Sequence, residues 1–309
     1  MTLAVVVSNW IDPLGWIFGW AALVAFGLYL AFMGFREVAP KLAAIMQTTA
    51  KESISQPLFL VLLLIGTALL VASTFIPYNT FGEDIKMLKS SGVTTIKLLS
   101  MFLGLWTASL AIAEEIEGRT ALTLLSKPVS RLQFILGKFL GVLVPVAAMF
   151  LILGVVFLCT VSKKVAYDAR ENSQEPPTVA QCLAEVKMIT PYLFVSFLEV
   201  VMLVSIIVAI STRLPMLPNL IICLSVYILG HLLPLLVQST EAGLEPVRFV
   251  AQLIAVVVPN LDHFNINPPV FRDMPIPKLY LGWTTAYAAI YTLFALVGAL
   301  FLFEDRDLA

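Results

Sequence analysis

Charge is scarce in this chain. Asp, Glu, Lys and Arg make up 13% of its 309 residues, whereas about 25% is usual for a soluble domain. Hydrophobic residues make up 60%, and the mean hydropathy is +0.95. The apolar runs are continuous rather than alternating, which argues against a membrane β-barrel. The composition therefore excludes an ordinary soluble domain and predicts an all-α, polytopic transmembrane helical bundle.

Cysteines are also few, and the first residues of the chain carry no basic side chain. The three cysteines have no metal or redox spacing. They are either three free thiols or, for Cys159 and Cys182, a pair near the outer face. A net charge of −1 gives no reason to expect nucleic acid as a partner. Residues 1–10 contain no Lys or Arg, so the first apolar run is expected to be a retained helix and not a signal peptide.

Catalytic motifs are missing too. Gly137-Lys138 lacks the upstream glycine and the following Ser or Thr of a Walker A phosphate loop. His-Glu-x-x-His and Gly-x-Ser-x-Gly are absent as well. We therefore expect no enzyme activity, no metal and no cofactor in this chain. Asn260, Asp262 and His263 supply too few ligands for a metal site.

Seven apolar runs are long enough to cross a bilayer as helices. They cover residues 13–35, 57–76, 93–113, 135–161, 189–211, 216–237 and 281–303. Polar loops are expected between them, at 77–92 and 162–187 among others. Gly15 with Gly19 and Gly137 with Gly141 have the small-xxx-small spacing of close helix contacts. The tryptophans near span ends are expected to be interface anchors: Trp10, Trp16, Trp20 and Trp283.

Two regions are mixed in character. Residues 36–56 carry Leu42, Ile45 and Met46 at helical spacing, which predicts a cytoplasmic amphipathic connecting helix. Residues 238–280 contain many prolines and an apolar piece, 249–258, that is too short to span. We expect an outer lid there, with short helices or a re-entrant piece.

The densest polar block lies between two apolar runs. Residues 114–134 form this block and read EEIEGRTALTLLSKPVSRLQF, and the next run begins with ILGKFLG at 135–141. Charge is unfavourable inside lipid, so the block is expected outside the bilayer and in contact with something there. Gly118 would allow a turn, Pro128 would stop a helix, and Ser130 is placed to cap the next helix, starting near Leu132.

This block resembles the hallmark of ABC-2-type transporter permeases. The chain is most similar to the subgroup linked to multicopper-enzyme maturation and gliding motility. The resemblance covers the chain from about Lys41 to its charged Arg306-Asp307-Leu308 ending. The matching residues are Glu114, Glu117, Gly118, Leu124, Leu125, Ser126, Pro128, Ser130, Arg131, Gly137 and Lys138.

The resemblance implies a six-span permease core at 57–309, preceded by an extra N-terminal helix within 1–35. It implies two permease halves, as a homo- or heterodimer in a lipid membrane, driven by separate ABC ATPase subunits that bind ATP and Mg²⁺. The region 114–134 would couple to the ATPase. Its coupling residues would be Glu114, Glu115, Glu117, Gly118, Arg119, Ser126, Pro128, Ser130 and Arg131.

Polar residues inside spans are candidates for the transport pathway. Glu199 lies near the middle of its run and either lines the pathway or pairs with Lys97 or His231. A structural, hydrogen-bonded Glu is the alternative. His231 is either a pathway residue or a helix-to-helix hydrogen bond. The spans show no polar stripe specific for a sugar, peptide or ion, so the substrate stays open.

Orientation follows from the position of the cations. The 19 Lys and Arg residues divide into nine on the proposed cytoplasmic side and ten on the other, so their number does not decide. The cytoplasmic ones lie close to span ends, which favours a cytoplasmic C-terminus. The resemblance implies a bacterial-type inner membrane. The predicted function is the permease subunit of an ATP-driven exporter. The alternative is a non-transporting scaffold for a periplasmic enzyme or motility complex. An ion-coupled carrier would need more intramembrane charge and an inverted repeat.

Overall fold

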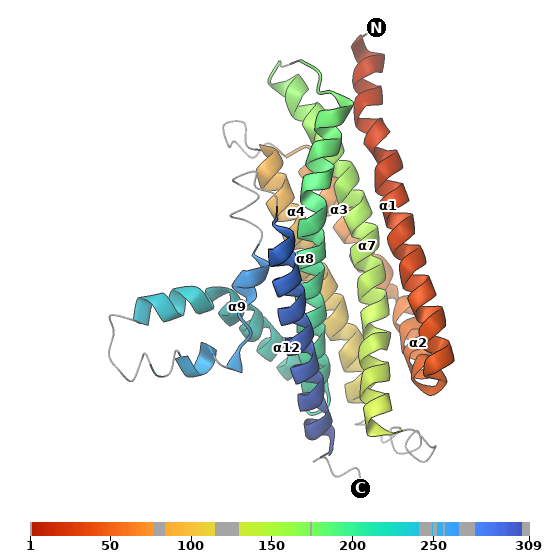
Figure 1. The fold of residues 1–309 in the computed structure, drawn as a ribbon, viewed down its shortest axis with the longest axis vertical. Helices are drawn as coiled ribbons and strands as arrows, with labels where there is room; N and C mark the ends of the chain where they lie inside the picture. Colours follow the sequence, from red (N-terminus) through yellow and green to blue (C-terminus); the bar gives the residue numbers. More distant parts are fainter. Residues whose placement is uncertain are drawn as a thin grey trace.

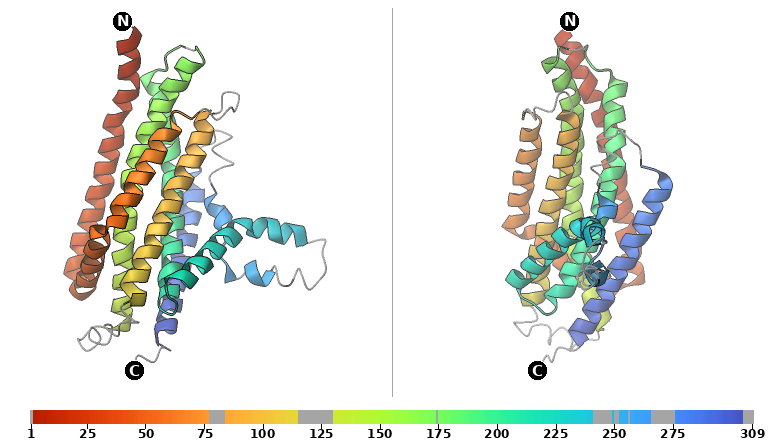
Figure 2. Two further views of the ribbon diagram at one scale, coloured as in Figure 1. Left: turned by 180° about the vertical axis from the view of Figure 1, so that it is seen from behind. Right: turned by 90° about the vertical axis from the view of Figure 1, so that its left-hand side faces the viewer.

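The computed structural model describes residues 2–76, 84–114, 130–173, 175–240, 249, 252–255, 257–265 and 276–304. This part of the chain forms a helical bundle without strands (Figures 1 and 2), which confirms the predicted all-α class. The start of α1 and the end of α12 lie at opposite ends of the bundle. The elements are α1 (Thr2–Val38), α2 (Pro40–Ser55), α3 (Pro57–Ser73), α4 (Asp84–Ala108), the π-helix η1 (Ser109–Glu114), α7 (Arg131–Glu171), α8 (Val179–Ser211), α9 (Met216–Thr240), the 3₁₀-helix η2 (Leu261–Phe264) and α12 (Lys278–Glu304).

Six helices of the described chain are long and apolar enough to cross a membrane. A seventh span is counted if α2 and α3, which meet at an angle of 62°, are taken as one bent span. The predicted run 57–76 corresponds to α3, which has only 17 residues. Five of the other six predicted runs each fall within one long helix, and the run 93–113 continues from α4 into η1.

Two expected loops are largely helical, which corrects the sequence prediction. α4 begins at Asp84, and α7 continues to Glu171 before α8 begins at Val179. The start of α8 is fixed by Thr178, whose hydroxyl accepts from the Gln181 backbone N–H while the Gln181 side chain accepts from the Thr178 N–H. This capping box is a local helix signal, but the charged residues around it had indicated a loop.

The elbow between α2 and α3 has a local cause. Pro57 cannot continue the α2 hydrogen-bond ladder, and it pushes the preceding residue out of the helical region. Gln56 is accordingly extended, with φ −71° and ψ 139°. Its side-chain oxygen accepts a hydrogen bond of 3.1 Å from the Trp106 indole, so the elbow is tied to α4.

α2 packs closely along the first turns of α7. A Cβ at Gly137 would lie 2.8 Å from Ile45, and one at Gly141 would lie 2.6 Å from Thr49 and 3.1 Å from the Met46 carbonyl. The predicted close contact at this glycine pair is therefore present. At Gly15 and Gly19 a Cβ would meet nothing within 4 Å, so the described structure has no such contact there.

α8 occupies the centre of the bundle and packs against α1, α4, α7, α9 and α12. α9 leaves the bundle at an angle, and the described parts of 238–280 lie beside the bundle at mid-height (Figure 1). They contain short helical pieces, and the outer lid stays a prediction. They pack on α8 and α12 through a second small core that includes Leu203, Leu261 and Phe264.

The glycine contact between α2 and α7 gives a stability prediction. Replacing Gly141 by Leu forces α2 away from α7, because the nearest obstacles include the Met46 backbone carbonyl. We expect the free energy of unfolding to fall by about 1–3 kcal/mol, measured as a lower thermal midpoint of the purified protein in detergent. Gly19→Leu is the matched control and should leave the midpoint unchanged. Equal effects of the two substitutions would contradict the packing argument.

Candidate functional site

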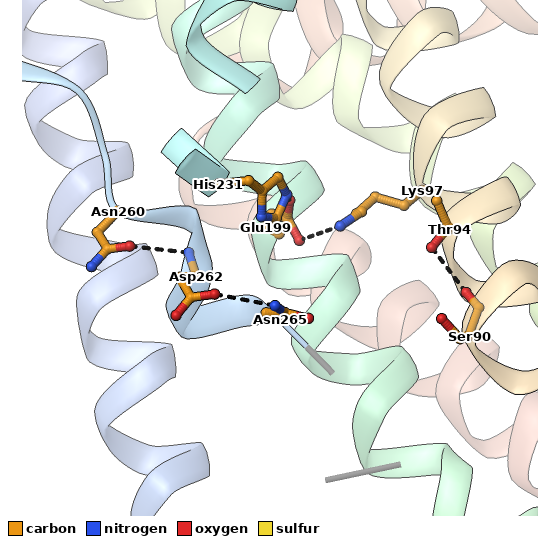
Figure 3. Close-up of polar contacts among 8 residues, drawn as sticks. All are labelled: Ser90, Thr94, Lys97, Glu199, His231, Asn260, Asp262 and Asn265. Carbon is orange, nitrogen blue, oxygen red and sulfur yellow. Dashed lines mark hydrogen bonds and ion pairs between the residues drawn. The ribbon is translucent and has the colours of Figure 1, made fainter. Parts of the chain in front are cut away.

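The candidate site is a cluster of charged side chains inside the bundle, centred on Glu199 of α8 (Figure 3). The Lys97 ammonium on α4 lies 2.9 Å from Glu199 Oε2. His231 Nε2 on α9 lies 3.0 Å from Glu199 Oε1. The sequence had offered Lys97 and His231 as alternative partners of this carboxylate, and the structure brings both to it.

Burial makes this cluster different from a surface ion pair. The side chain of Glu199 is fully buried, that of Lys97 is 10% exposed and that of His231 is 24% exposed. A buried charge needs a close counter-ion and further hydrogen bonds to offset its lost hydration. Here each carboxylate oxygen has its own basic partner, so Glu199 is satisfied while three helices are joined.

Tyr227 completes the cluster one turn before His231 on α9. Its ring makes an edge-to-face contact with the His231 ring at 4.7 Å, and the Lys97 ammonium lies 5.4 Å from its centroid. The aromatic face attracts the cation and packs the imidazole in place. Sequence reasoning did not find this contact of Tyr227 with Lys97.

A row of polar side chains leads away from the cluster. Ser90 and Thr94 precede Lys97 on one face of α4 and are half-buried. On the other side, Asn260 and Asp262 belong to the segment that includes η2, which packs against α9 at Gly230, the residue before His231. Glu199 and Lys97 are thus the buried centre of a polar zone whose ends reach the molecular surface.

The lid segment, defined as residues 257–265, is held against α12 by three tyrosines. The Tyr287 hydroxyl accepts from the Asn260 N–H at 2.9 Å. The hydroxyls of Tyr280 and Tyr291 donate to the carbonyls of His263 (2.5 Å) and Val257 (2.6 Å). These contacts satisfy backbone groups that irregular chain would otherwise leave unpaired in apolar surroundings.

A glycine on α9 lets the lid segment approach the cluster. A Cβ at Gly230, next to His231, would lie 2.6 Å from Leu261 and 2.8 Å from the Pro259 carbonyl. Any larger residue would push the segment off α9 and away from His231. The lid segment and the charged cluster are therefore packed as one unit.

The predicted coupling region is described only at its edges. Glu114 ends η1, a π-helical turn of the kind often found at functional sites. Ser130 caps α7 through a capping box with Gln133, so the helix starts at Arg131, one residue before the expected position. Glu115, Glu117, Gly118, Arg119, Ser126 and Pro128 lie outside the described residues.

Sequence reasoning missed a second charged layer, at the end of the bundle opposite Arg131. The fully buried ammonium of Lys164 lies 3.0 Å from Asp168 and 3.8 Å from Asp84, and it donates to the Thr74 carbonyl. Lys89 pairs with Glu185, joining α4 to α8. The i, i+4 spacing of Lys164 and Asp168 could have indicated a helical ion pair. Both residues were instead expected in the polar loop 162–187.

The described residues hold no cluster of His, Cys, Asp or Glu suited to a metal ion. His263 and Asn260 are 3.5 Å apart at the exposed surface. Cys159, Cys182 and Cys223 are free thiols. The structure therefore agrees with three free thiols and not with a disulfide between Cys159 and Cys182.

Comparison with known proteins adds one match. The family model described as ABC-2 family transporter protein matches residues 24–308. The match begins inside α1, at Val24, and runs through every later helix. No curated protein matches the chain.

The charge balance of the cluster gives the next prediction. Glu199→Gln keeps the side-chain shape but leaves the Lys97 ammonium buried without a counter-ion. We expect the free energy of unfolding to fall by about 3 kcal/mol, seen in thermal unfolding of the detergent-purified protein. The exposed Glu52→Gln on α2 is the matched control and should have no effect.

A double variant separates lost pairing from lost packing. Lys97→Met with Glu199→Leu replaces both charges by apolar groups, so most of the stability should return. A double variant as unstable as Glu199→Gln would show that the ion pair is not the origin of the loss.

Proposed function

The chain belongs to the ABC-2 family of transporter proteins, and from this premise we propose that it is the permease subunit of an ATP-driven exporter. The observation that carries the proposal is the family match over residues 24–308, together with the multi-pass helical fold. ATP hydrolysis would take place in separate ATPase subunits, and this chain would move in response. We place the protein, by the same argument, in the inner membrane of a bacterial-type cell with its C-terminus in the cytoplasm.

Within the family, we assign the chain to the subgroup related to multicopper-enzyme maturation and gliding motility. The motif in residues 114–141 supports this assignment. The motif also supports contact with an ATPase, because three acidic residues and then several basic residues follow one another in a short segment between two long helices. Such a segment can bind a partner surface through complementary charges.

Two helices flank the coupling region and transmit its movement. α4 leads into it through η1, and α7 leaves it at Arg131. Three residues into α7, Phe134 stacks on Phe303 at the end of α12, with ring centroids 5.6 Å apart. A push by the ATPase on residues 114–134 would therefore reach α4, α7 and α12 together.

The transport pathway would pass the Glu199 cluster. α4 carries Lys97, and α12 carries the tyrosines that hold the lid segment, so both elements next to the cluster connect to the coupling region. A shift of α4 relative to α8 changes the separation of Lys97 and Glu199 directly. The lid segment beside His231 is the proposed gate.

A second permease copy would complete the pathway. His231 is partly exposed, and Asn260 and Asp262 lie at the surface on the same side. Lipid offers such groups neither water nor hydrogen bonds. A second copy facing this side would cover them and enclose a polar passage between the two chains, as a homodimer or with a related partner.

Docking to the ATPase is tested by charge reversal. We expect an ATPase to co-purify with the wild-type protein from detergent and to be lost with Glu117→Lys/Arg131→Glu, since like charges would then face the partner. Arg170→Glu/Glu175→Lys makes the same exchange at the opposite end of α7 and should retain the ATPase.

A different outcome would favour the scaffold function. If the folded wild-type protein brings down no ATPase although candidate ATPases are expressed, the chain has no energy source. If the control exchange loses the ATPase as fully as the test exchange, the coupling region is not the docking surface.

Alternating access is tested at Thr94, one turn before Lys97. With the three native cysteines replaced by alanine, Thr94→Cys should react with a membrane-impermeant thiol reagent at rates that differ several-fold between the nucleotide-free and ATP-trapped complexes. The reason is that the pathway opens to one side at a time. Ser91→Cys, exposed on the same helix, should react equally in both states. Equal rates at Thr94 would contradict a pathway past the cluster.

A further inference from the structure

An apolar cavity of about 220 Å³ lies between α1, α7 and α8. Every residue around it is apolar, aromatic or glycine, and they come from all three helices. They are Trp20, Val24, Leu28, Ala147, Phe150, Leu151, Gly154, Leu193, Phe194 and Phe197. A dry apolar cavity of roughly 150 Å³ already accepts a benzene-sized guest. This space is therefore large enough for several methylene groups.

The cavity is separate from the candidate transport site. Phe197 and Glu199 are two residues apart on α8, so they point to opposite sides of the helix at about 100° per residue. The rim of the cavity reaches the molecular surface, because Leu28 is 53% exposed and Phe194 is 43% exposed. A molecule lying beside the bundle can therefore enter the cavity from the side without crossing the pathway.

A cation lies beyond one end of the cavity. Trp20, which lines the cavity, stacks on Trp16 with ring centroids 6.5 Å apart. The ammonium of Lys187 lies 6.0 Å from the Trp16 ring. Lys187 is exposed, and among the described residues it makes no ion pair with a carboxylate. Along one side of the bundle, the Lys187 ammonium is thus followed in space by the two tryptophans and then by the apolar cavity.

We propose that this groove binds one phospholipid, with an acyl chain in the cavity and the headgroup phosphate at Lys187. The arrangement matches the order of groups in such a lipid: a charged head, an interfacial region where tryptophan is favoured, and a hydrocarbon chain. A lysine at the start of an apolar run is placed at headgroup depth. An anionic headgroup is preferred, because the lysine then meets net negative charge.

The bound lipid serves as packing material between α1 and the bundle. α1 buries only 11% of its most apolar window, whereas α8 buries 67%. Without an occupant, the aromatic side chains around the cavity would lose contacts on one side. With a chain in place, Trp20 of α1 and Phe150 of α7 have a common neighbour. The family match begins at Val24, so Trp16 and Trp20 lie outside it.

The test is native mass spectrometry of the delipidated full-length protein in detergent, titrated with phosphatidylglycerol. We expect one saturable lipid for each copy of the chain. Gly154→Leu fills the cavity, where a Cβ has room because its nearest neighbour, a Leu193 methyl, is 3.9 Å away. This variant should lose the lipid. Gly282→Leu, which faces open space on α12, is the control and should bind it as the wild type does.

The headgroup contact is tested at constant cavity shape. Lys187→Gln should weaken binding of the first phosphatidylglycerol roughly fivefold, and Lys187→Arg should restore it. Lys278→Gln removes a similar exposed charge at the start of α12 and should change nothing. Because Lys187 is at the surface, its variants fold even if Gly154→Leu does not.

Three results would overturn the proposal. The first is retention of the lipid by folded Gly154→Leu, which would place the lipid elsewhere. The second is that a phosphate-free detergent occupies the cavity equally well and that Lys187→Gln has no effect on lipid binding. The cavity would then accept any alkyl chain and would not be a phospholipid site. The third is loss of dimer rather than of lipid in Gly154→Leu, which would make the groove an interface between copies. The experiment uses no ATPase, so its outcome is independent of the proposed transport function.

Discussion

A carboxylate buried in an apolar bundle must be satisfied by other side chains, and Glu199 imposes this requirement on three helices at once. Lys97 of α4 and His231 of α9 approach it from different sides, so the positions of both helices are fixed relative to α8. Hydrophobic contacts alone do not set such a register between membrane helices, since lipid competes for the same surfaces. The polar zone and the position of α9 beside α8 depend on this one group.

The two ends of the bundle are built on different principles. At the end that holds Arg131, small residues let α2 pack tightly on α7, and aromatic stacking joins α7 to α12. At the other end, buried lysines such as Lys164 hold the helices together through ion pairs and carbonyl contacts. Contacts at the first end permit sliding of packed surfaces, whereas ion pairs at the second resist it. Movement of the helices is therefore expected to begin at the coupling end and to pivot near the charged end.

Much of the fold could be predicted from the sequence, because long apolar runs and caps are local signals. Ser130 was placed correctly as a helix cap, and the helix at 36–56 was expected from its spacing. The helical ends around Lys164 and Glu185 were taken for loops, since their charges looked solvated until partners from other helices were known. The three-way contact at Glu199 was foreseen only as a set of alternatives. The hydrogen bonds of the tyrosines with the lid segment leave no pattern in the amino-acid sequence, because their partners are backbone atoms.

The attachment of the lid segment to α12 has an evolutionary consequence. The hydroxyls of Tyr280, Tyr287 and Tyr291 hydrogen-bond to its main chain, at His263, Asn260 and Val257. Main-chain groups are the same whatever side chain each residue carries. The segment can thus exchange its outward-facing side chains, Asp262 among them, without detaching from the helix. A lineage could change which chemical groups border the passage while keeping the three hydrogen bonds that anchor the segment to α12.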